Sequence, residues 1–194
     1  TSCQLGNILV TASGDTLENI FQTRIADIIG MQNWQWRHYG LSDDGRGLEI
    51  VDYFLNPTGI YGGGIASNPK DIARFGLLFL NRGRWNGQQL INPAWIDEAT
   101  TNQVPTSLSA GASFDLRGRF GYGWWTNGID ISGNRPWPSA PHRTYTFYGG
   151  GRNFCMIVPE WNMVIARMSP PTESAQPDDT VWDGFFNRLG NGIQ

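Results

Sequence analysis

Short apolar runs alternate most clearly with turn residues between residues 145 and 168. Residues 154–158 (Phe-Cys-Met-Ile-Val) are apolar and bounded by turn formers, and residues 162–168 are rich in β-branched and sulfur-containing side chains. Both segments predict buried strands, joined as a hairpin by Pro159, Glu160 and Trp161. Ahead of them, Gly149, Gly150 and Gly151 lack Cβ atoms, which suits a backbone that comes close to a substrate.

Helical patterns come before and after this hairpin. An apolar run from Leu5 ends at the stop signal Ser13-Gly14, and Asp15, paired with Glu18 as a capping box, opens a second helix that Gly30 closes. A third helix after Pro69 and a fourth after the Asn92-Pro93 cap follow. The last helix starts at an Asp178-Asp179 cap, and its apolar stripe predicts that it covers a face of a sheet: Val181, Trp182, Phe185, Phe186 and Leu189.

Other segments lack such periodicity. Residues 31–53 contain aromatic residues amid Gly and Asp, which favours a folded loop over regular structure, and residues 81–87 predict a turn. Residues 100–119 form a polar loop, residues 120–125 predict an aromatic strand, and residues 130–143 are a Pro- and Trp-containing excursion. We find no repeat and no internal domain linker.

Composition narrows the class of protein. A chain of 194 residues with 40% hydrophobic residues can bury one sizeable core. Its net charge of -3 provides no basic field for a nucleic acid, and no apolar run is long enough to span a bilayer. We therefore expect a small-molecule or peptide partner.

The cysteines and histidines do not have metal-ligand spacing. Cys3 and Cys155 are too few for a disulfide framework, and His38 and His142 lie far from both in the sequence. We expect no metal site, and we interpret Cys155 as a small buried apolar residue. The first residues, which do not include an initiator Met, leave the compartment undetermined.

The single lysine creates a Ser-x-x-Lys spacing from Ser67 to Lys70. A lysine one helical turn from a serine can deprotonate it for nucleophilic attack. A serine just before Pro69 and Asp71 is also what a helix N-cap looks like, and we favour this capping interpretation over catalysis.

Several motifs in order carry a resemblance to a known family. They are Gly62-Gly63-Gly64 with Ser67, the helix from Asp71 to Leu78, Gly83-Arg84-Trp85-Asn86-Gly87, Gly121-Tyr122-Gly123-Trp124-Trp125, and Gly149-Gly150-Gly151-Arg152-Asn153 followed by Val158-Pro159-Glu160. This succession resembles the serine β-lactamase-like and penicillin-binding-protein-like hydrolases. The class C, esterase and 6-aminohexanoate-dimer hydrolase branch is the most similar. The resemblance covers nearly the whole chain and fits the C-terminal portion of such a protein.

The resemblance implies an α/β fold of the α+β type, in which helices and a mostly helical region flank an antiparallel sheet. It also implies acyl transfer, in which a serine attacks the substrate and backbone N–H groups hold the oxyanion before water deacylates the enzyme. It implies no metal or organic cofactor, and a periplasmic or secreted bacterial location.

The same resemblance places the site residues. The family's nucleophile helix would precede residue 1, so the catalytic Ser and Lys are expected outside this chain, and Ser2 is a candidate for the last member of the Tyr-x-Ser element. Gly149, Gly150 and Gly151 would supply the substrate strand and the oxyanion N–H, with tight backbone packing as the alternative. Tyr148 would shape the acyl pocket or serve the core, and Asn153 would contact substrate or serve the turn. Trp36 and His38 would border the cleft or belong to a packed loop.

We expect residues 1–194 to be a partial domain, with a helical and loop region over about 1–119 and the sheet and last helix over about 120–194. A missing N-terminal segment or another copy would then cover the unpaired sheet edge. Three alternatives remain: a non-catalytic module that binds a peptide or glycan, Thr1 as a processed N-terminal nucleophile, and Ser67 with Lys70 acting alone.

Overall fold

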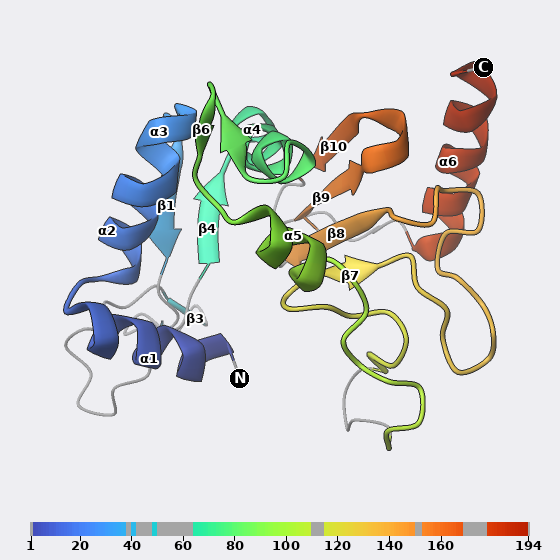
Figure 1. Ribbon diagram of the computed structural model, residues 1–194, viewed down its shortest axis with the longest axis horizontal. Helices are drawn as coiled ribbons and strands as arrows, with labels where there is room; N and C mark the ends of the chain where they lie inside the picture. Colours follow the sequence, from blue (N-terminus) through green and yellow to red (C-terminus); the bar gives the residue numbers. More distant parts are fainter. Residues whose placement is uncertain are drawn as a thin grey trace. The chain divides into compact units, whose positions relative to one another are not determined.

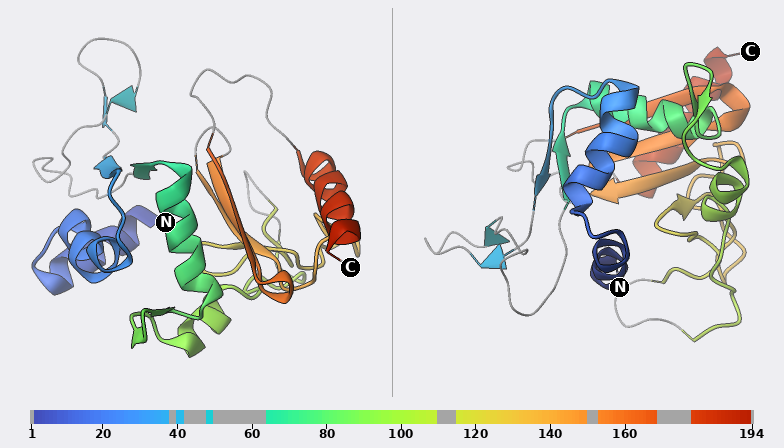
Figure 2. Two further views of the ribbon diagram at one scale, coloured as in Figure 1. Left: turned by 90° about the horizontal axis from the view of Figure 1, so that it is seen from above. Right: turned by 60° about the vertical axis from the view of Figure 1, so that its left-hand side comes forward.

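The computed structural model describes residues 2–37, 40–41, 48–49, 64–109, 115–149, 153–168 and 178–193 (Figure 1 and Figure 2). They belong to two compact units, Thr1–Asp71 and Ile72–Gln194. The expected partial domain, with a helical region before and a sheet region after about residue 119, stays a prediction. Thr1, His38, Gly150 and Gly151 lie outside the described residues, so the predictions made for them stay predictions.

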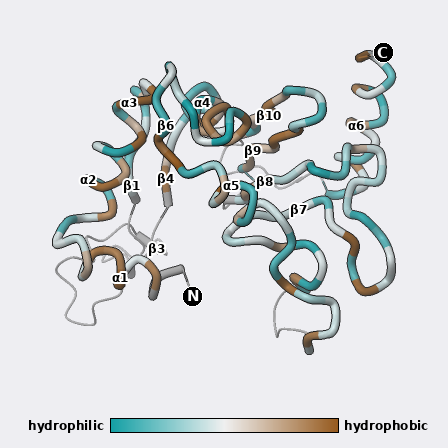
Figure 3. The backbone as a smooth tube through the Cα atoms, viewed as in Figure 1, coloured by the Kyte–Doolittle hydropathy of each residue, from teal (hydrophilic) through white to brown (hydrophobic). Residues whose placement is uncertain are grey.

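The first unit begins with helix α1 (Ser2–Ser13), as the apolar run predicts. Gly14 ends the helix with a φ of 68°, and its N–H donates to the Val10 carbonyl. Figure 3 shows hydrophobic positions along α1. Leu5 and Ile8 on this helix are 69% and 64% exposed, so its apolar face is not buried within the described chain.

A second helical segment follows and ends at Gly30, as predicted. It consists of α2 (Leu17–Phe21), a π-helical turn η1 (Gln22–Ala26) and α3 (Asp27–Ile29). The predicted capping box is wrong by one residue, because Thr16 is the N-cap and accepts from the Asn19 N–H at 3.0 Å. Asp15 instead accepts from the Asn19 side chain at 2.7 Å, outside the helix.

Three strands lie where the sequence predicted a loop, so this prediction is wrong. β1 (Trp34–Arg37) pairs antiparallel with β4 (Gly64–Ser67), and β2 (Gly40–Leu41) pairs with β3 (Leu48–Glu49). The partner of β1 lies about thirty residues later in the chain, and local composition carries no record of such a distant partner. Glycines and acidic residues nearby made this stretch look like a loop.

The second unit is built on an antiparallel sheet in the order β10-β9-β8-β7. The strands are β7 (Trp125–Thr126), β8 (Tyr145–Gly149), β9 (Asn153–Val158) and β10 (Met163–Arg167). The predicted hairpin is confirmed: the 3₁₀ turn η4 (Pro159–Trp161) and Asn162, with a φ of 49°, join β9 to β10.

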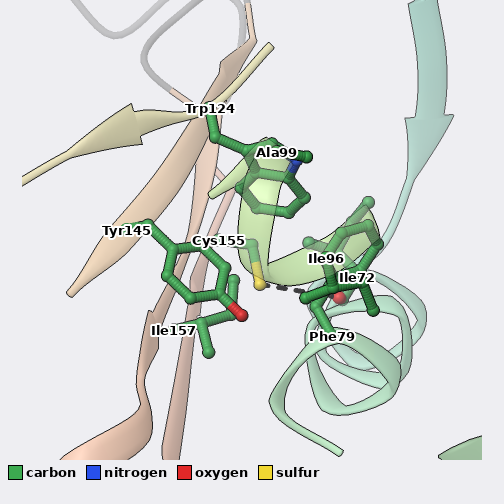
Figure 4. Packing of buried hydrophobic residues seen from close by; sticks show 8 residues of the cluster. All are labelled: Ile72, Phe79, Ile96, Ala99, Trp124, Tyr145, Cys155 and Ile157. Atoms are coloured by element: carbon green, nitrogen blue, oxygen red, sulfur yellow. Dashed lines mark hydrogen bonds between the residues drawn. The ribbon is translucent and has the colours of Figure 1, made fainter. Parts of the chain in front are cut away.

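Successive residues of β9 face opposite sides of the sheet, and each side packs against a different helix (Figure 2, left). On one side, Cys155 and Ile157 pack against Ile72 and Phe79 of α4 (Pro69–Leu80). Figure 4 shows this cluster, in which the Cys155 thiol lies 3.7 Å from the Ile72 carbonyl oxygen. The predicted role of Cys155 as a buried apolar residue is confirmed, because it is 0% exposed.

Helix α6 (Asp179–Gly192) covers the other side of the sheet, as the sequence predicted. Asp178 caps it by accepting from the Val181 N–H at 3.0 Å. Trp182 and Phe186 are buried against residues 154, 156 and 158 of β9. Val181 and Phe185 are exposed, so the buried stripe is narrower than predicted.

Two smaller elements complete this unit. The predicted cap at Asn92 is confirmed, because its side chain accepts from the Ala94 N–H at the start of α5 (Pro93–Ala99). The predicted turn near residue 87 is the tip of a hairpin between β5 (Arg84–Trp85) and β6 (Gln88–Gln89). Asn86 and Gly87 both have positive φ there, as tight hairpin turns require.

Candidate active site

The carboxyl end of β8 is the best candidate site in the second unit. β7 pairs with β8 only through Trp125 opposite Thr146 and Thr126 opposite Tyr145. β9 pairs with all five residues of β8 and ends the ladder with Gly149 opposite Asn153. Within the described chain, residues 147–149 therefore have a neighbouring strand on one side only. We call residues 145–146 the closed half of β8 and residues 147–149 its open half.

A tight turn keeps β7 short. Gly123, with a φ of 81°, turns the chain between the isolated bridge partners Phe120 and Trp125. Gly121 lies against α5, where an added Cβ would come 2.1 Å from the Ala99 carbonyl oxygen. The prediction of one aromatic strand over residues 120–125 is therefore wrong. These glycines fold that stretch back on itself, and only its last residue enters the sheet.

The register decides which backbone groups face the open side. The Asn127 N–H donates to the Thr144 carbonyl at 2.9 Å, so the carbonyl of residue 144 points toward the chain that follows β7. Because these directions alternate along a strand, Tyr148 presents its backbone groups on the same side as Thr144. Gly149 presents its groups toward Asn153 of β9. Gly149 therefore faces β9 and not the open side. Gly150 and Gly151, which we had also expected to supply N–H groups at this edge, lie outside the described residues, so that role stays a prediction.

The side chains at this end are packed. The Tyr148 ring is half-buried, with its centroid 5.8 Å from that of Trp125 and 6.0 Å from that of Phe154. It packs against the cluster under α6, so its ring serves the core on that side of the sheet. Asn153 is half-buried opposite Gly149. Their contacts with substrate stay predictions.

The closed half is held by a buried asparagine that the sequence analysis missed. Asn127 is 0% exposed, and its side-chain amide donates to the carbonyls of Trp137, Ala140 and Pro141 at 2.8–3.2 Å. Its side-chain oxygen accepts from the Trp137 N–H at 3.1 Å. This one amide organises the excursion between β7 and β8. A polar residue directly after the short strand β7 was the only local signal for it.

Burial also raises the pKa values of two side chains on the side of the sheet that faces α4, Cys155 of β9 and Tyr145 of β8. It raises the pKa of the Cys155 thiol to about 12 and the pKa of the Tyr145 phenol above its ordinary value. Both groups are therefore neutral at physiological pH. An inert, protonated thiol is a structural group and not a nucleophile.

Ser67 and Lys70 lie in the first unit and do not form a helical pair. Ser67 is the last residue of β4, and its hydroxyl donates to the Asn33 carbonyl at 3.2 Å. Lys70 is exposed in the first turn of α4. The favoured capping role of Ser67 is wrong, because Asn68 accepts from the Asp71 N–H at 2.9 Å. Strand β4 extends one residue further than the Ser-Asn-Pro signal suggests, which moves the cap to Asn68.

Asp71 is the second polar residue that the sequence analysis missed. Its carboxylate is 0% exposed and accepts from the backbone N–H groups of Gln32 and Asn33 at 3.0 and 2.7 Å. It therefore fixes the loop that leads into β1. The spacing from Asn68 to Asp71 is that of a capping box and could have identified it.

The remaining candidates also lie in the first unit. Ser2 is the first residue of α1, and its proposed role stays a prediction. Trp36 is half-buried in β1 with its ring 6.5 Å from that of Phe21. The Trp36 indole N–H is buried and has no hydrogen-bond partner among the described residues. This packing in a strand is compatible with the packed alternative for Trp36.

Metal and membrane features were searched in the described ranges. In these ranges no three His, Cys, Asp or Glu side chains gather as a metal site would require. None of the described helices is long and apolar enough to cross a bilayer.

Comparisons with known proteins identify the fold. The chain is similar to a proposed β-lactamase from Bacteroides dorei DSM 17855 (17% identity, TM-score 0.60, covering 97% of this chain and 54% of that one). It is also similar to a proposed 6-aminohexanoate-dimer hydrolase from Bacillus anthracis (22% identity, TM-score 0.65, 97% and 42%). A third similar structure is simvastatin synthase from Aspergillus terreus (16% identity, TM-score 0.59, 97% and 54%).

The chain thus spans about half the length of these structures, and the predicted α+β fold is confirmed. No curated protein sequence matches the chain significantly. The model of the Beta-lactamase family matches residues 2–183, which is most of the chain. The chain belongs to the Beta-lactamase family.

Proposed function

We propose that residues 1–194 are part of a β-lactamase-related serine hydrolase that cleaves an ester, amide or peptide through an acyl-serine intermediate. Membership of the family supports the reaction class. The catalytic Ser and Lys belong to a segment outside these residues. Ser67 and Lys70 are poor substitutes, because Ser67 lies in a strand and its hydroxyl is engaged with Asn33.

The open half of β8 carries this proposal. This half is extended and β7 does not pair with it, so we infer that an extended acyl group lies along it in the manner of an added strand. A backbone N–H at such an edge is fixed by the sheet before substrate arrives. It can therefore stabilise an oxyanion without reorganisation during the reaction.

The same proposal assigns a partner to the far edge of the sheet. β10 is the edge strand of the described sheet, and the first unit exposes apolar residues of α1. We propose that a further segment of the family domain, or another copy of this chain, covers these surfaces. Residues 1–194 alone would then associate or precipitate. A monodisperse monomer of 21.6 kDa that melts cooperatively would contradict this part of the proposal.

Steady-state hydrolysis by the protein as its gene encodes it tests the proposed activity. The substrates are p-nitrophenyl acetate, the chromogenic cephalosporin nitrocefin and a D-alanyl-D-alanine peptide. We expect turnover of at least one substrate, with a burst of product equal to the enzyme concentration when deacylation is slow. Absence of turnover and burst on all three, with binding of an intact peptide, would favour the non-catalytic binding module instead.

A further inference from the structure

We propose that a hollow beside α6 binds a short neutral saccharide. The hollow has a volume of about 460 Å³ and lies between η4, the end of α6 and the loop at Ser139. It lies at the end of β9 that leads into η4, whereas the open half of β8 adjoins the opposite end of β9. The inference is therefore independent of the proposed acyl transfer.

The floor of the hollow is aromatic. Trp161 is half-buried, and its ring lies 6.1 Å from that of the fully buried Phe186. Gly190 allows the helix backbone to approach, because a Cβ there would lie only 3.2 Å from Cζ2 of Trp161. An indole that packs against Phe186 and lies close to Gly190 can offer a flat apolar surface to the C–H face of a sugar ring.

The rim of the hollow offers amide groups. Asn187 and Asn191 are both exposed, one helical turn apart, and the Asn191 side chain donates to the Asn187 side-chain oxygen at 3.2 Å. After this bond forms, the side-chain NH₂ group of Asn187 can still donate, and Asn191 keeps one N–H donor and its side-chain oxygen as an acceptor. Adjacent sugar hydroxyls, which both donate and accept, match that arrangement.

The uncharged lining of the hollow favours a neutral ligand. The described residues that line the hollow include aromatic, amide, hydroxyl, glycine and aliphatic groups, and none of these residues is charged. Such a lining gives an anionic or cationic ligand no counter-charge after desolvation. A volume within the range of small-molecule sites and a mixed apolar and polar lining fit one or two sugar rings.

The walls are held in place before any ligand binds. The Ser139 N–H donates to the Asp183 carboxylate at 2.6 Å, and the Trp137 indole N–H donates to Asp179 at 3.1 Å. Asp179 and Asp183 are one turn apart on α6, so two bonds fasten the loop to the helix. A preformed site loses less entropy when it binds a ligand.

Calorimetric or ligand-observed NMR titration of the purified protein tests this site with maltotriose, cellotriose and chitotriose. We expect at least one trisaccharide to bind with a Kd of about 1 mM or tighter. The double variant Asn187→Ala/Asn191→Ala should weaken that binding about tenfold, because both side chains are exposed and their loss spares the core. Trp161→Phe should weaken it as well.

Two matched controls separate this site from general surface effects. Asn134→Ala removes another exposed asparagine, and Trp95→Ala removes a half-exposed tryptophan on α5, and both should leave binding unchanged. Failure of all three trisaccharides to bind would overturn the proposal. Binding that the Asn187/Asn191 variant leaves unchanged, or that Asn134→Ala or Trp95→Ala weakens equally, would overturn it too.

Discussion

The two halves of β8 differ in what surrounds them, although they belong to one five-residue strand. The closed half has a strand on each side, and Tyr145 and Thr146 are buried. The open half has β9 alone beside it among the described residues. The late start of β7 makes this difference, because the turn at Gly121 and Gly123 lets the strand begin only at Trp125, opposite Thr146. The comparison indicates that the closed half holds the sheet together, whereas the open half lies beyond the reach of β7 and is the part to which we assign recognition in the proposed function.

The largest effect should follow from removing the amide that anchors the closed half. Asn127→Ala leaves the Trp137 N–H and three carbonyls without their buried partner. We expect a loss of about 3 kcal/mol in the free energy of unfolding, measured by urea denaturation. Asn134→Ala, at an exposed position, should change it by less than about 0.5 kcal/mol. Equal effects of the two variants would contradict the anchoring role.

A somewhat smaller effect should follow from disturbing the turn that shortens β7. Gly121→Ala places a Cβ against the Ala99 carbonyl oxygen, so the turn or α5 must shift. We expect a cost of about 2 kcal/mol in the same denaturation experiment. Gly184→Ala is the matched control, because a Cβ there meets nothing within 4 Å on α6. Because alanine has a higher helix propensity than glycine, this control should raise the free energy of unfolding by up to about 1 kcal/mol.

Substitution beside the open half should affect activity more than stability. We expect Asn153→Ala to lower kcat/KM of the encoded protein about tenfold, which corresponds to about 1.4 kcal/mol. Its free energy of unfolding should fall by less than that of Asn127→Ala, because Asn153 is only half-buried. If Asn153→Ala lowers the free energy of unfolding as much as Asn127→Ala does but leaves kcat/KM unchanged, the open half has a structural role only.

The effect of the buried thiol is absent at neutral pH and appears only above pH 9. Because burial raises the pKa of Cys155 to about 12 from the ordinary value of 9.0, the stability linked to its neutral form is complete below pH 9. That stability is lost as the pH rises from 9 toward 12. Tyr145 acts in the same direction. Cys155→Ala should therefore make the decline in stability above pH 9 less steep, as followed by thermal melting between pH 7 and 11. An unchanged slope would contradict the burial argument.

Local patterns predicted much of the second unit. The β9–β10 hairpin, the Asn92 and Asp178 caps and the burial of Cys155 depend on short-range chemistry that the sequence displays directly. The pairing of β1 with β4 was not predictable in this way, because its partners are distant in sequence. The roles of Asp71 and Asn127 were not predictable either, because both side chains bind backbone groups that are distant in the sequence.

The candidate site was predicted in outline but not in its atoms. The glycine run begins at Gly149, the residue at which β8 ends in the structure, and its contact with substrate stays a prediction. The direction of each N–H depends on the strand register, and one residue of register reverses it. For that reason Gly149 faces β9, which the sequence did not indicate, and the role expected of Gly150 and Gly151 stays a prediction.

Covalent labelling with a fluorophosphonate tests the central claim most directly. The protein as its gene encodes it is labelled, its intact mass is measured, and the adduct is located by peptide mapping. The account predicts one adduct per chain, on a serine outside residues 1–194. An adduct on Ser67 or Thr1, or a protein that remains unlabelled while folded, would contradict the claim that this chain is part of an acyl-transfer enzyme whose nucleophile lies elsewhere.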